Sequence, residues 1–228
     1  MKSTVFQLFG EVGIRDYIER SQSRAWKGIL LHHSASPTAA QYEGIETIRA
    51  IERYHIDVNK WRAIGYNFVF APDGSIFTGR PLDMVGAHAG TPNAWALKEF
   101  GGSNGPNQWL IGLCAIGNYD NGTPSEALKD SLRLVSRLLA QRFDLDYWLG
   151  HYEVHATACP GKALKGFEWM EPLDVKAMFA TPSPWAADTW ARFRTDGIVD
   201  GSAPLQSTSR EMTAVMIERA IDKYCVRR

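Results

Sequence analysis

The chain has 228 residues, of which 45% are hydrophobic and 22% charged, so it carries enough apolar side chains for a sizeable core and is not a disordered polymer. Lysine plus arginine equals aspartate plus glutamate at 25 each, which leaves no net positive field to hold a nucleic acid. No stretch approaches the ~18 consecutive apolar residues that cross a bilayer. We therefore predict neither nucleic-acid binding nor membrane insertion.

Two further features of the composition bear on the cellular compartment. Residues 1–22 contain polar and charged side chains where a secretory signal would keep an apolar run, so we expect synthesis in the cytoplasm without a Sec signal. The three cysteines, Cys114, Cys159 and Cys225, are an odd number at wide spacing, which is not a disulfide framework. Cys114 lies in an apolar run and is predicted to be a small buried side chain, whereas Cys225 has no evident partner.

The first half of the chain alternates strand and helix patterns. Residues 26–31 (WKGILL) form a short apolar run that predicts a buried strand, with His32 and His33 directly at its end. Residues 44–56 predict an amphipathic helix, because apolar side chains recur there at helical spacing: Ile45, Ile48, Ile51 and, more loosely, Tyr54. Residues 66–70 and 75–78 flank a Pro-Asp-Gly turn and predict a hairpin.

The second half continues the alternation. Residues 109–116 (WLIGLCAI) predict a strand in the centre of a sheet, and residues 123–126 (TPSE) predict the start of a long helix. The apolar face of that helix comprises Leu128, Leu132, Val135, Leu138, Leu139 and Phe143. A short strand at 147–149 then leads to His151 and a loop at 155–161. The predicted fold class is α/β, with a central mixed β-sheet flanked by helices.

A linker pattern separates the end of the chain. Residues 181–184 (TPSP) read as a linker, so we predict a catalytic domain at 1–180 and a small α-helical segment at 181–228. About 45 residues are too few for an independent core, so this segment should dock on the first domain, associate with another copy or bind something else.

Three residues are of the types that ligate zinc: His32 at a strand end, His151 after another strand, and Cys159 in a loop bounded by glycine and proline. Two imidazoles and one thiolate leave a fourth tetrahedral position open, as in catalytic zinc sites. Zinc brings the pKa of a water ligand to about 7 and polarises a carbonyl, and amide hydrolysis needs both. By spacing alone the pattern is weak, because a single histidine or cysteine is usually structural.

Five segments together carry a more specific signal: LLHHSAS, IGYNFVFAPDGSIFTGR, VGAHAGTPN, IGLCAIGNY and GHYEVHATACPG. In this order they resemble the zinc amidases of the superfamily of peptidoglycan recognition proteins and phage T7 lysozyme, over roughly residues 26–164. The resemblance implies cleavage of the amide bond between N-acetylmuramic acid and L-alanine in bacterial peptidoglycan. It also implies Zn²⁺ as the cofactor, with His32, His151 and Cys159 as its ligands and His33 as the less favoured neighbour.

The resemblance assigns catalytic roles to two more residues. Tyr66 follows Ile-Gly, and its hydroxyl is expected to hydrogen-bond the attacking water or the developing oxyanion. Thr157 stands two residues before Cys159, where family members carry lysine, threonine or arginine, and it supplies a hydrogen bond rather than a charge. The alternatives are a hairpin aromatic that packs on the sheet and an ordinary loop hydroxyl.

Three residues are assigned to substrate binding. His88, in GAHAG, is expected to line the substrate groove near the metal, with a structural hydrogen bond as the alternative. His33 and Asn93 complete the predicted substrate-binding set. The role of His155 is left open between competing for the metal and contacting the substrate.

The C-terminal segment has its own resemblance. Residues 185–224 are similar to one S-layer homology repeat, a module that binds secondary cell-wall polysaccharide, although such modules usually contain several repeats. Oligomerisation through this segment would assemble several copies. The alternative is a helix pair that packs on the amidase through an apolar stripe.

An amidase with a wall-directed appendage and no signal resembles a phage or prophage endolysin, which acts on the cell wall after its release. A cytoplasmic amidase that recycles peptidoglycan is one alternative. A non-catalytic peptidoglycan-binding protein is the other, although members of that class lack the zinc-ligating cysteine that is present here as Cys159.

Overall fold

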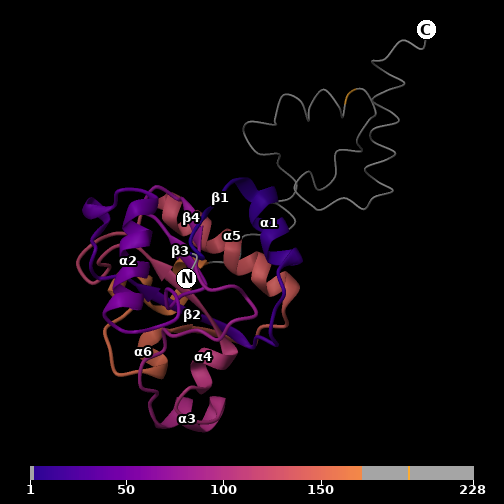
Figure 1. Cartoon of the computed structure of the whole chain (residues 1–228), viewed down its shortest axis with the longest axis vertical. Helices are drawn as coiled ribbons and strands as arrows, with labels where there is room; N and C mark the ends of the chain where they lie inside the picture. Colours follow the sequence, from indigo (N-terminus) through magenta and orange to yellow (C-terminus); the bar gives the residue numbers. More distant parts are fainter. Residues whose placement is uncertain (1–2, 171–194, 196–228) are drawn as a thin grey trace. The chain divides into compact units, whose positions relative to one another are not determined.

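A six-stranded mixed sheet organises the computed structural model, which describes residues 3–170 and 195. Its strands are β1 (Gln7–Leu8), β2 (Gly28–His33), β3 (Phe68–Phe70), β4 (Ile76–Thr78), β5 (Leu110–Ala115) and β6 (Tyr147–Gly150), in the order β1-β4-β3-β5-β2-β6 (Figure 1). Strands β3, β5, β2 and β6 are parallel, whereas β4 pairs antiparallel with β1 and β3. The predicted α/β class with a mixed sheet is confirmed.

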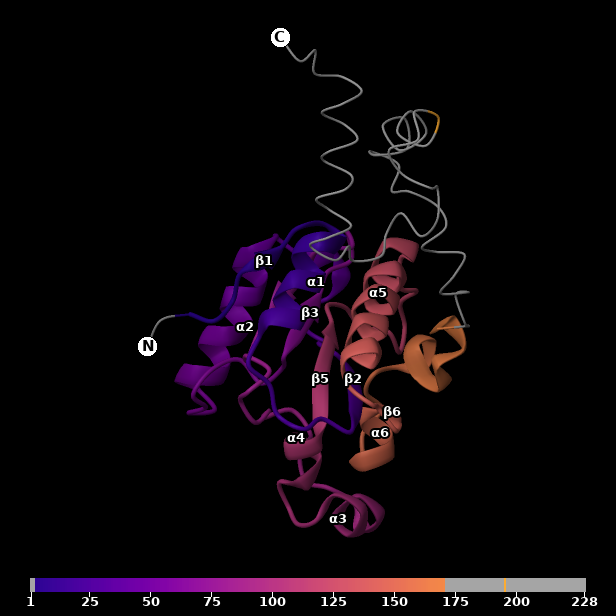
Figure 2. The ribbon, with the colours of Figure 1, turned by 90° about the vertical axis from the view of Figure 1, so that its right-hand side faces the viewer.

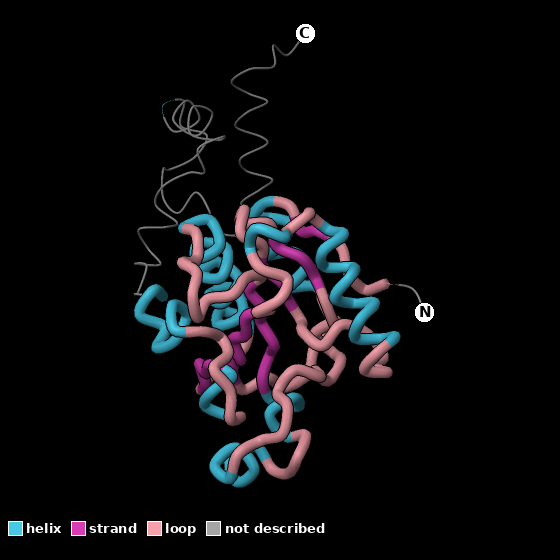
Figure 3. Tube along the Cα trace, turned by 90° about the vertical axis from the view of Figure 1, so that its left-hand side faces the viewer, coloured by secondary structure: helices cyan, strands magenta, loops and turns pink. Residues whose placement is uncertain are grey.

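Helices cover both faces of this sheet. The helices are α1 (Gly10–Arg20), α2 (Ile45–Asp57), α3 (Ala94–Phe100), α4 (Gly105–Trp109), α5 (Glu126–Arg142) and α6 (His151–Val154), with 3₁₀ turns at Ala39–Gln41 and Lys162–Met170. Helices α1 and α5 lie on one side of the sheet and α2 on the other (Figures 1 and 2). Helices α3, α4 and α6 gather at one end, and the strands, magenta in Figure 3, run between the layers. Among the described helices none is long and apolar enough to span a membrane.

The register of the central strands decides which side chains share a face. His32 of β2 pairs with Cys114 of β5, so the two side chains point to the same side, whereas the preceding pair, Leu31 and Leu113, points into the core under α1 and α5. Cys114 is fully buried, in a cluster that includes residues on the α2 side, as predicted. Both faces of the sheet therefore pack against apolar clusters, and His32 lies on the face that also carries the cluster under α2.

Most predicted elements are confirmed. The hairpin forms between β3 and β4 with Val69 opposite Phe77, and α5 begins as predicted, with the Ser125 hydroxyl accepting a hydrogen bond from the Leu128 N–H at 3.1 Å. Strand β5 is central, with neighbours on both sides. The predicted boundary near residue 180, the helical segment 181–228 and Cys225 lie outside the described residues.

Three local predictions need correction or addition. Trp109 ends α4 instead of starting the strand, because a short helix with Pro106 in its first turn precedes the strand. Tyr54 is 56% exposed, because Glu52 takes the inward place on α2, where it accepts hydrogen bonds from residues 3 and 4. Helix α1 was not predicted, since two of its eleven residues are glycines, which weaken the helical signal.

Candidate metal centre and adjoining groove

The fold brings the three predicted ligands together. His32 stands near the carboxyl end of β2, His151 directly follows the neighbouring parallel strand β6, and Cys159 lies in the loop after α6. Because Leu31 pairs with Gly150, the two histidines emerge side by side, with ring centroids 4.4 Å apart. One candidate ligand atom from each of the three residues lies within 4.8 Å of the others, and Cys159 Sγ is 3.7 Å from His32 Nδ1.

The chemistry of this donor set fits a zinc ion. Two imidazole nitrogens and one sulfur lie close together and could serve as three ligands of a tetrahedral site, with one position left for substrate or water. The backbone N–H of His33 points at Cys159 Sγ over 3.4 Å, a contact that favours the thiolate form. The residues at the cluster therefore have the identity of zinc ligands and lie close enough together to hold such an ion.

Burial keeps the two histidines of the cluster neutral. It lowers the pKa of His32 well below its usual value, helped by the nearby His151, and it lowers the pKa of His151 to about 4. Burial also raises the pKa of the Cys159 thiol to about 11, while the His33 backbone acts in the opposite direction. At neutral pH the imidazoles can bind a cation without losing a proton, whereas the thiol must release one.

Tyr66 lies beside the cluster, with its ring centroid 5.3 Å from that of His32. Its position just before β3 is fixed by the next residue, Asn67, whose side chain accepts from the Gly112 N–H and donates to the Arg80 carbonyl. The buried Arg80 guanidinium in turn donates to three carbonyls in this region, those of residues 63, 64 and 85. Burial, followed by the neighbouring cysteines, raises the pKa of Tyr66 well above its usual value, so the phenol stays protonated.

Thr157 and His155 flank Cys159 in the closing loop. The Thr157 hydroxyl accepts a hydrogen bond from the Cys159 N–H at 3.2 Å and so shapes the turn that carries the sulfur. His155 stacks on His151 with centroids 5.1 Å apart, and its Nδ1 lies 2.6 Å from the Thr91 carbonyl. Within the described part of the chain, His155 does not belong to the ligand cluster.

The three predicted substrate-binding residues have structural partners. His33 is 7% exposed and its Nδ1 accepts from the Tyr119 N–H at 3.1 Å; His88, also 7% exposed, lies with Nδ1 3.0 Å from His32 Nε2. Asn93 caps α3, since its side chain accepts from the Ala96 N–H and donates to a carbonyl of α6. None of the three lines the groove described next, and their roles toward substrate stay predictions.

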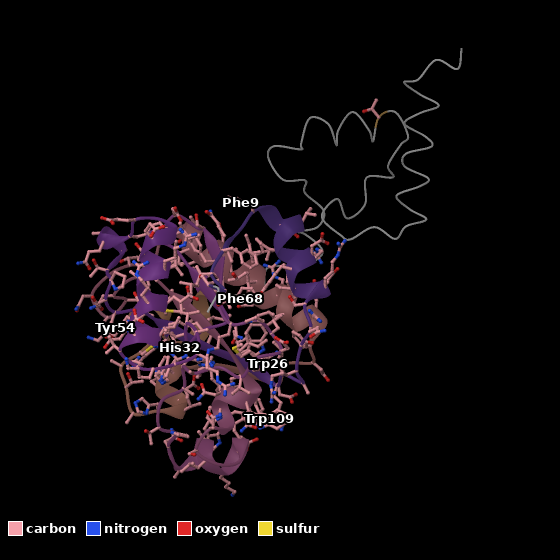
Figure 4. All side chains as sticks on the ribbon, viewed as in Figure 1. Phe9, Trp26, His32, Tyr54, Phe68 and Trp109 are labelled. Atoms are coloured by element: carbon pink, nitrogen blue, oxygen red, sulfur yellow. The ribbon has the colours of Figure 1, made fainter. Side chains whose placement is uncertain are left out.

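A groove of about 740 Å³ lies next to the cluster. Helix α2 and the loop after β2 form it together with Tyr66, and its lining comprises Ser34, Ser36, Pro37, Gln41, Glu43, Glu46, Thr47, Ala50, Ile51, Arg53, Tyr54, His55 and Tyr66. His32 lies inside the domain, whereas Tyr54 lies at its outer edge on α2 (Figure 4). Tyr66 therefore contributes to the groove wall and is also a neighbour of the cluster.

Sequence reasoning missed two residues of this region. His55 lines the groove, accepts from the Gly65 N–H at 3.2 Å and packs 4.7 Å from the Trp61 ring, and its place seven residues after Ile48 on α2 is a helical signal that was available. Asn107 is buried behind the cluster and accepts hydrogen bonds from two backbone N–H groups. No local sequence signal distinguishes Asn107 from an ordinary polar residue.

Comparisons of the sequence agree with this arrangement. Residues 22–162 match the family model described as N-acetylmuramoyl-L-alanine amidase. The N-acetylmuramoyl-L-alanine amidase of Mus musculus is 34% identical over 143 residues, which cover 60% of this chain and 24% of the mouse protein. Peptidoglycan-recognition protein SC1a of Drosophila melanogaster is 31% identical over 138 residues, which cover 58% of this chain and 66% of that protein. The chain thus spans about a quarter of the length of the mammalian relative.

Solved structures show the same fold. The N-acetylmuramoyl-L-alanine amidase LysC from Clostridium intestinale superposes with a TM-score of 0.52 at 26% identity, over 64% of this chain and 83% of that one. Drosophila PGRP-LB superposes with a TM-score of 0.51 at 27% identity, over 63% and 79% of the two chains. The family match at residues 22–162 covers strands β2 to β6, helices α2 to α6 and the segments that supply the cluster, and the chain belongs to the N-acetylmuramoyl-L-alanine amidase family.

Proposed function

We propose that this protein hydrolyses the amide bond between N-acetylmuramic acid and L-alanine in bacterial peptidoglycan, with a Zn²⁺ ion held by His32, His151 and Cys159. One observation carries the proposal: the three ligand types converge within 4.8 Å beside a groove whose wall includes Tyr66. Family membership supports the bond assignment. The donor set supports the metal.

In this proposal the groove binds the substrate, whereas the cluster and Tyr66 take part in the reaction. When bound, zinc would supply a Lewis acid for the carbonyl and an acidified water. The groove along α2 would hold the stem peptide so that the lactyl carbonyl next to L-alanine lies at the cluster. Water adds to the carbonyl carbon, and the protonated Tyr66 hydroxyl donates a hydrogen bond to the carbonyl oxygen as negative charge develops there.

Collapse of the tetrahedral intermediate breaks the carbon–nitrogen bond, and the leaving amine of L-alanine takes a proton that came from the attacking water. Thr157 contributes by holding the Cys159 N–H, which fixes the direction of the sulfur. The products are a glycan strand with free lactyl carboxylates and a stem peptide with a free L-alanine amino terminus. This assignment gives Thr157 a supporting hydrogen bond in place of the charge that a lysine would bring.

A non-catalytic peptidoglycan-binding protein is the second candidate, because the family relatives include recognition proteins. The presence of the complete ligand set, including Cys159, favours the enzyme. The two kinds of amidase differ in substrate: an endolysin would degrade intact cell wall, whereas a recycling amidase would prefer soluble muropeptides. We propose intact wall as the substrate.

Digestion of purified peptidoglycan tests the proposal. Mass analysis compares the zinc-loaded protein, the protein with chelator and the Cys159→Ser variant, on intact sacculi and on soluble fragments. We expect new L-alanine amino termini in the first sample only. New reducing sugar ends or internal peptide cuts would overturn the bond assignment, and binding without cleavage would establish the receptor function.

A further inference from the structure

Two consecutive residues of the turn at 86–90 contact both histidines of the cluster from behind. His88 Nδ1 lies 3.0 Å from His32 Nε2, and the Ala89 carbonyl oxygen lies 3.0 Å from His151 Nε2. In His32 this contact is made to Nε2, whereas the opposite ring nitrogen, Nδ1, lies 3.7 Å from Cys159 Sγ. One short turn therefore reaches the outer side of both rings.

The direction of these hydrogen bonds follows from elementary chemistry. A carbonyl oxygen only accepts, so His151 Nε2 carries the proton and its Nδ1 keeps a lone pair. If His32 also presents Nδ1 to a metal, its Nε2 must donate, and His88 Nδ1 must accept. His88 is then protonated on Nε2, which is buried, has the Leu110 backbone as a polar neighbour, and makes no hydrogen bond of good geometry among the described residues.

A buried amide side chain, together with backbone hydrogen bonds from Gly86 and Ala87, holds this turn in place. The side-chain oxygen of Asn107 accepts from the backbone N–H of His88 at 2.8 Å and from that of Ala89 at 3.0 Å. The Asn107 amide nitrogen donates to the Asn104 side-chain oxygen at 2.9 Å, which fixes the orientation of the amide. Asn107 is 7% exposed, so these contacts are shielded from water.

The sequence also leaves room for the His88 ring. A Cβ atom at Gly112 would lie 2.5 Å from His88 Cδ2, and a Cβ atom at Gly86 would lie equally close. Gly112 is on β5, next to the strand that carries His32. Two glycines therefore form the slot that lets an imidazole reach the outer nitrogen of His32.

We propose that the turn at 86–90, anchored by Asn107, is the outer support of the metal centre, with His88 as a positioning residue that makes Nδ1 of His32 the ligand atom. This inference rests on the proposed function, because it presumes that the cluster binds zinc. For His88 it develops the alternative of a structural hydrogen bond, beside the expectation that this residue lines the substrate groove. Partners of this kind orient a ligating histidine and raise its basicity, and their loss typically weakens metal binding about 10- to 100-fold.

A matched pair of variants at His88 isolates the acceptor. His88→Leu removes it at similar volume, whereas His88→Asn keeps a side-chain oxygen near the place of Nδ1. Zinc dissociation constants are measured by competition with a chromophoric chelator, and Co²⁺ absorption spectra report the ligand geometry. We expect His88→Leu to weaken zinc about 10- to 100-fold and to change the cobalt spectrum, and His88→Asn to stay within a few-fold of the wild type.

Equal zinc affinity for His88→Leu and the wild type would overturn the inference, as would equal losses in both His88 variants with both metal-free proteins folded. If His88→Leu does not fold without metal, the pair Asn107→Ala and Asn107→Asp decides, since only the latter keeps an acceptor for the two N–H groups. Thr91→Ala, exposed next to the turn, is the control. A wild type that binds no zinc, or binds it and cuts nothing, would instead count against the proposed function.

Discussion

The metal-ligand cluster and the groove beside it are built in different ways. Each ligand of the cluster is oriented by a further contact: His32 by His88, His151 by a backbone carbonyl and Cys159 by the His33 N–H. The groove is lined largely by side chains of α2 and the loop after β2, several of them exposed and charged. The proposed chemistry thus lies at the end of a sheet, whereas the proposed recognition surface is spread over a helix face and a loop.

Among the variants proposed, Cys159→Ser is expected to show the largest difference between its effect on activity at the cluster and its effect on binding in the groove. A neutral hydroxyl is a far weaker zinc ligand than a thiolate, so we expect amidase activity to fall by more than about 10³-fold while peptidoglycan binding in the groove persists. A pull-down with insoluble peptidoglycan and a digestion assay measure the two properties. Cys225→Ser is the matched control, and loss of binding together with activity would show that the two regions are not separable.

Tyr66→Phe tests the residue that the two regions share. Removal of the hydroxyl should lower kcat about 10²- to 10³-fold, because a hydrogen bond to the developing oxyanion is lost. Zinc affinity should change less than about threefold, since the phenol is not a ligand. Steady-state kinetics and chelator competition measure these effects, and an unchanged kcat would remove Tyr66 from the chemistry.

Zinc binding at the cluster should depend on pH, because the Cys159 thiol must release a proton when the metal binds. Burial lowers the pKa of His151 to about 4 and that of His32 well below its usual value, so both rings are neutral at neutral pH. Burial raises the Cys159 pKa to about 11, so its thiol loses a proton when the metal binds. Zinc affinity should therefore rise about tenfold per pH unit between pH 6 and 8. Calorimetry in buffers of different ionisation enthalpy should detect about one released proton per zinc. Release of no proton would contradict a thiolate ligand.

The smallest effects are expected from charges in the groove. Arg53→Ala and Glu43→Gln remove opposite charges from its lining and should each change KM by about 2- to 10-fold, with kcat nearly constant. Zinc affinity should not change in either variant. Arg20→Ala, on the exposed side of α1, is the control. A large change in kcat would mean that the groove also positions the reacting bond.

Much of the fold and the three residues that form the cluster could be predicted from the sequence. The strand predicted at 26–31, the helix at 44–56 and the hairpin at 66–78 are observed with bounds shifted by a few residues, because side-chain period and turn chemistry are local properties. His32 and His151 stand at or next to strand ends, where parallel neighbours bring their side chains to one edge. The convergence of Cys159 with them needed the resemblance, since a loop cysteine has no periodicity.

What the tertiary structure decided is which contacts the remaining polar residues make. His88 and Asn93, expected at substrate, have structural partners, and Asn107 holds the turn behind the cluster without any local sign of that role. These contacts join residues about 20 to 60 positions apart in the chain, and they depend on strand register and on the space that Gly112 leaves on β5. The sequence by itself determined which chemical groups lie near the strand ends; only the packing of distant segments determined which nitrogen of each ring faces the site, because hydrogen-bond direction is a property of neighbours in space.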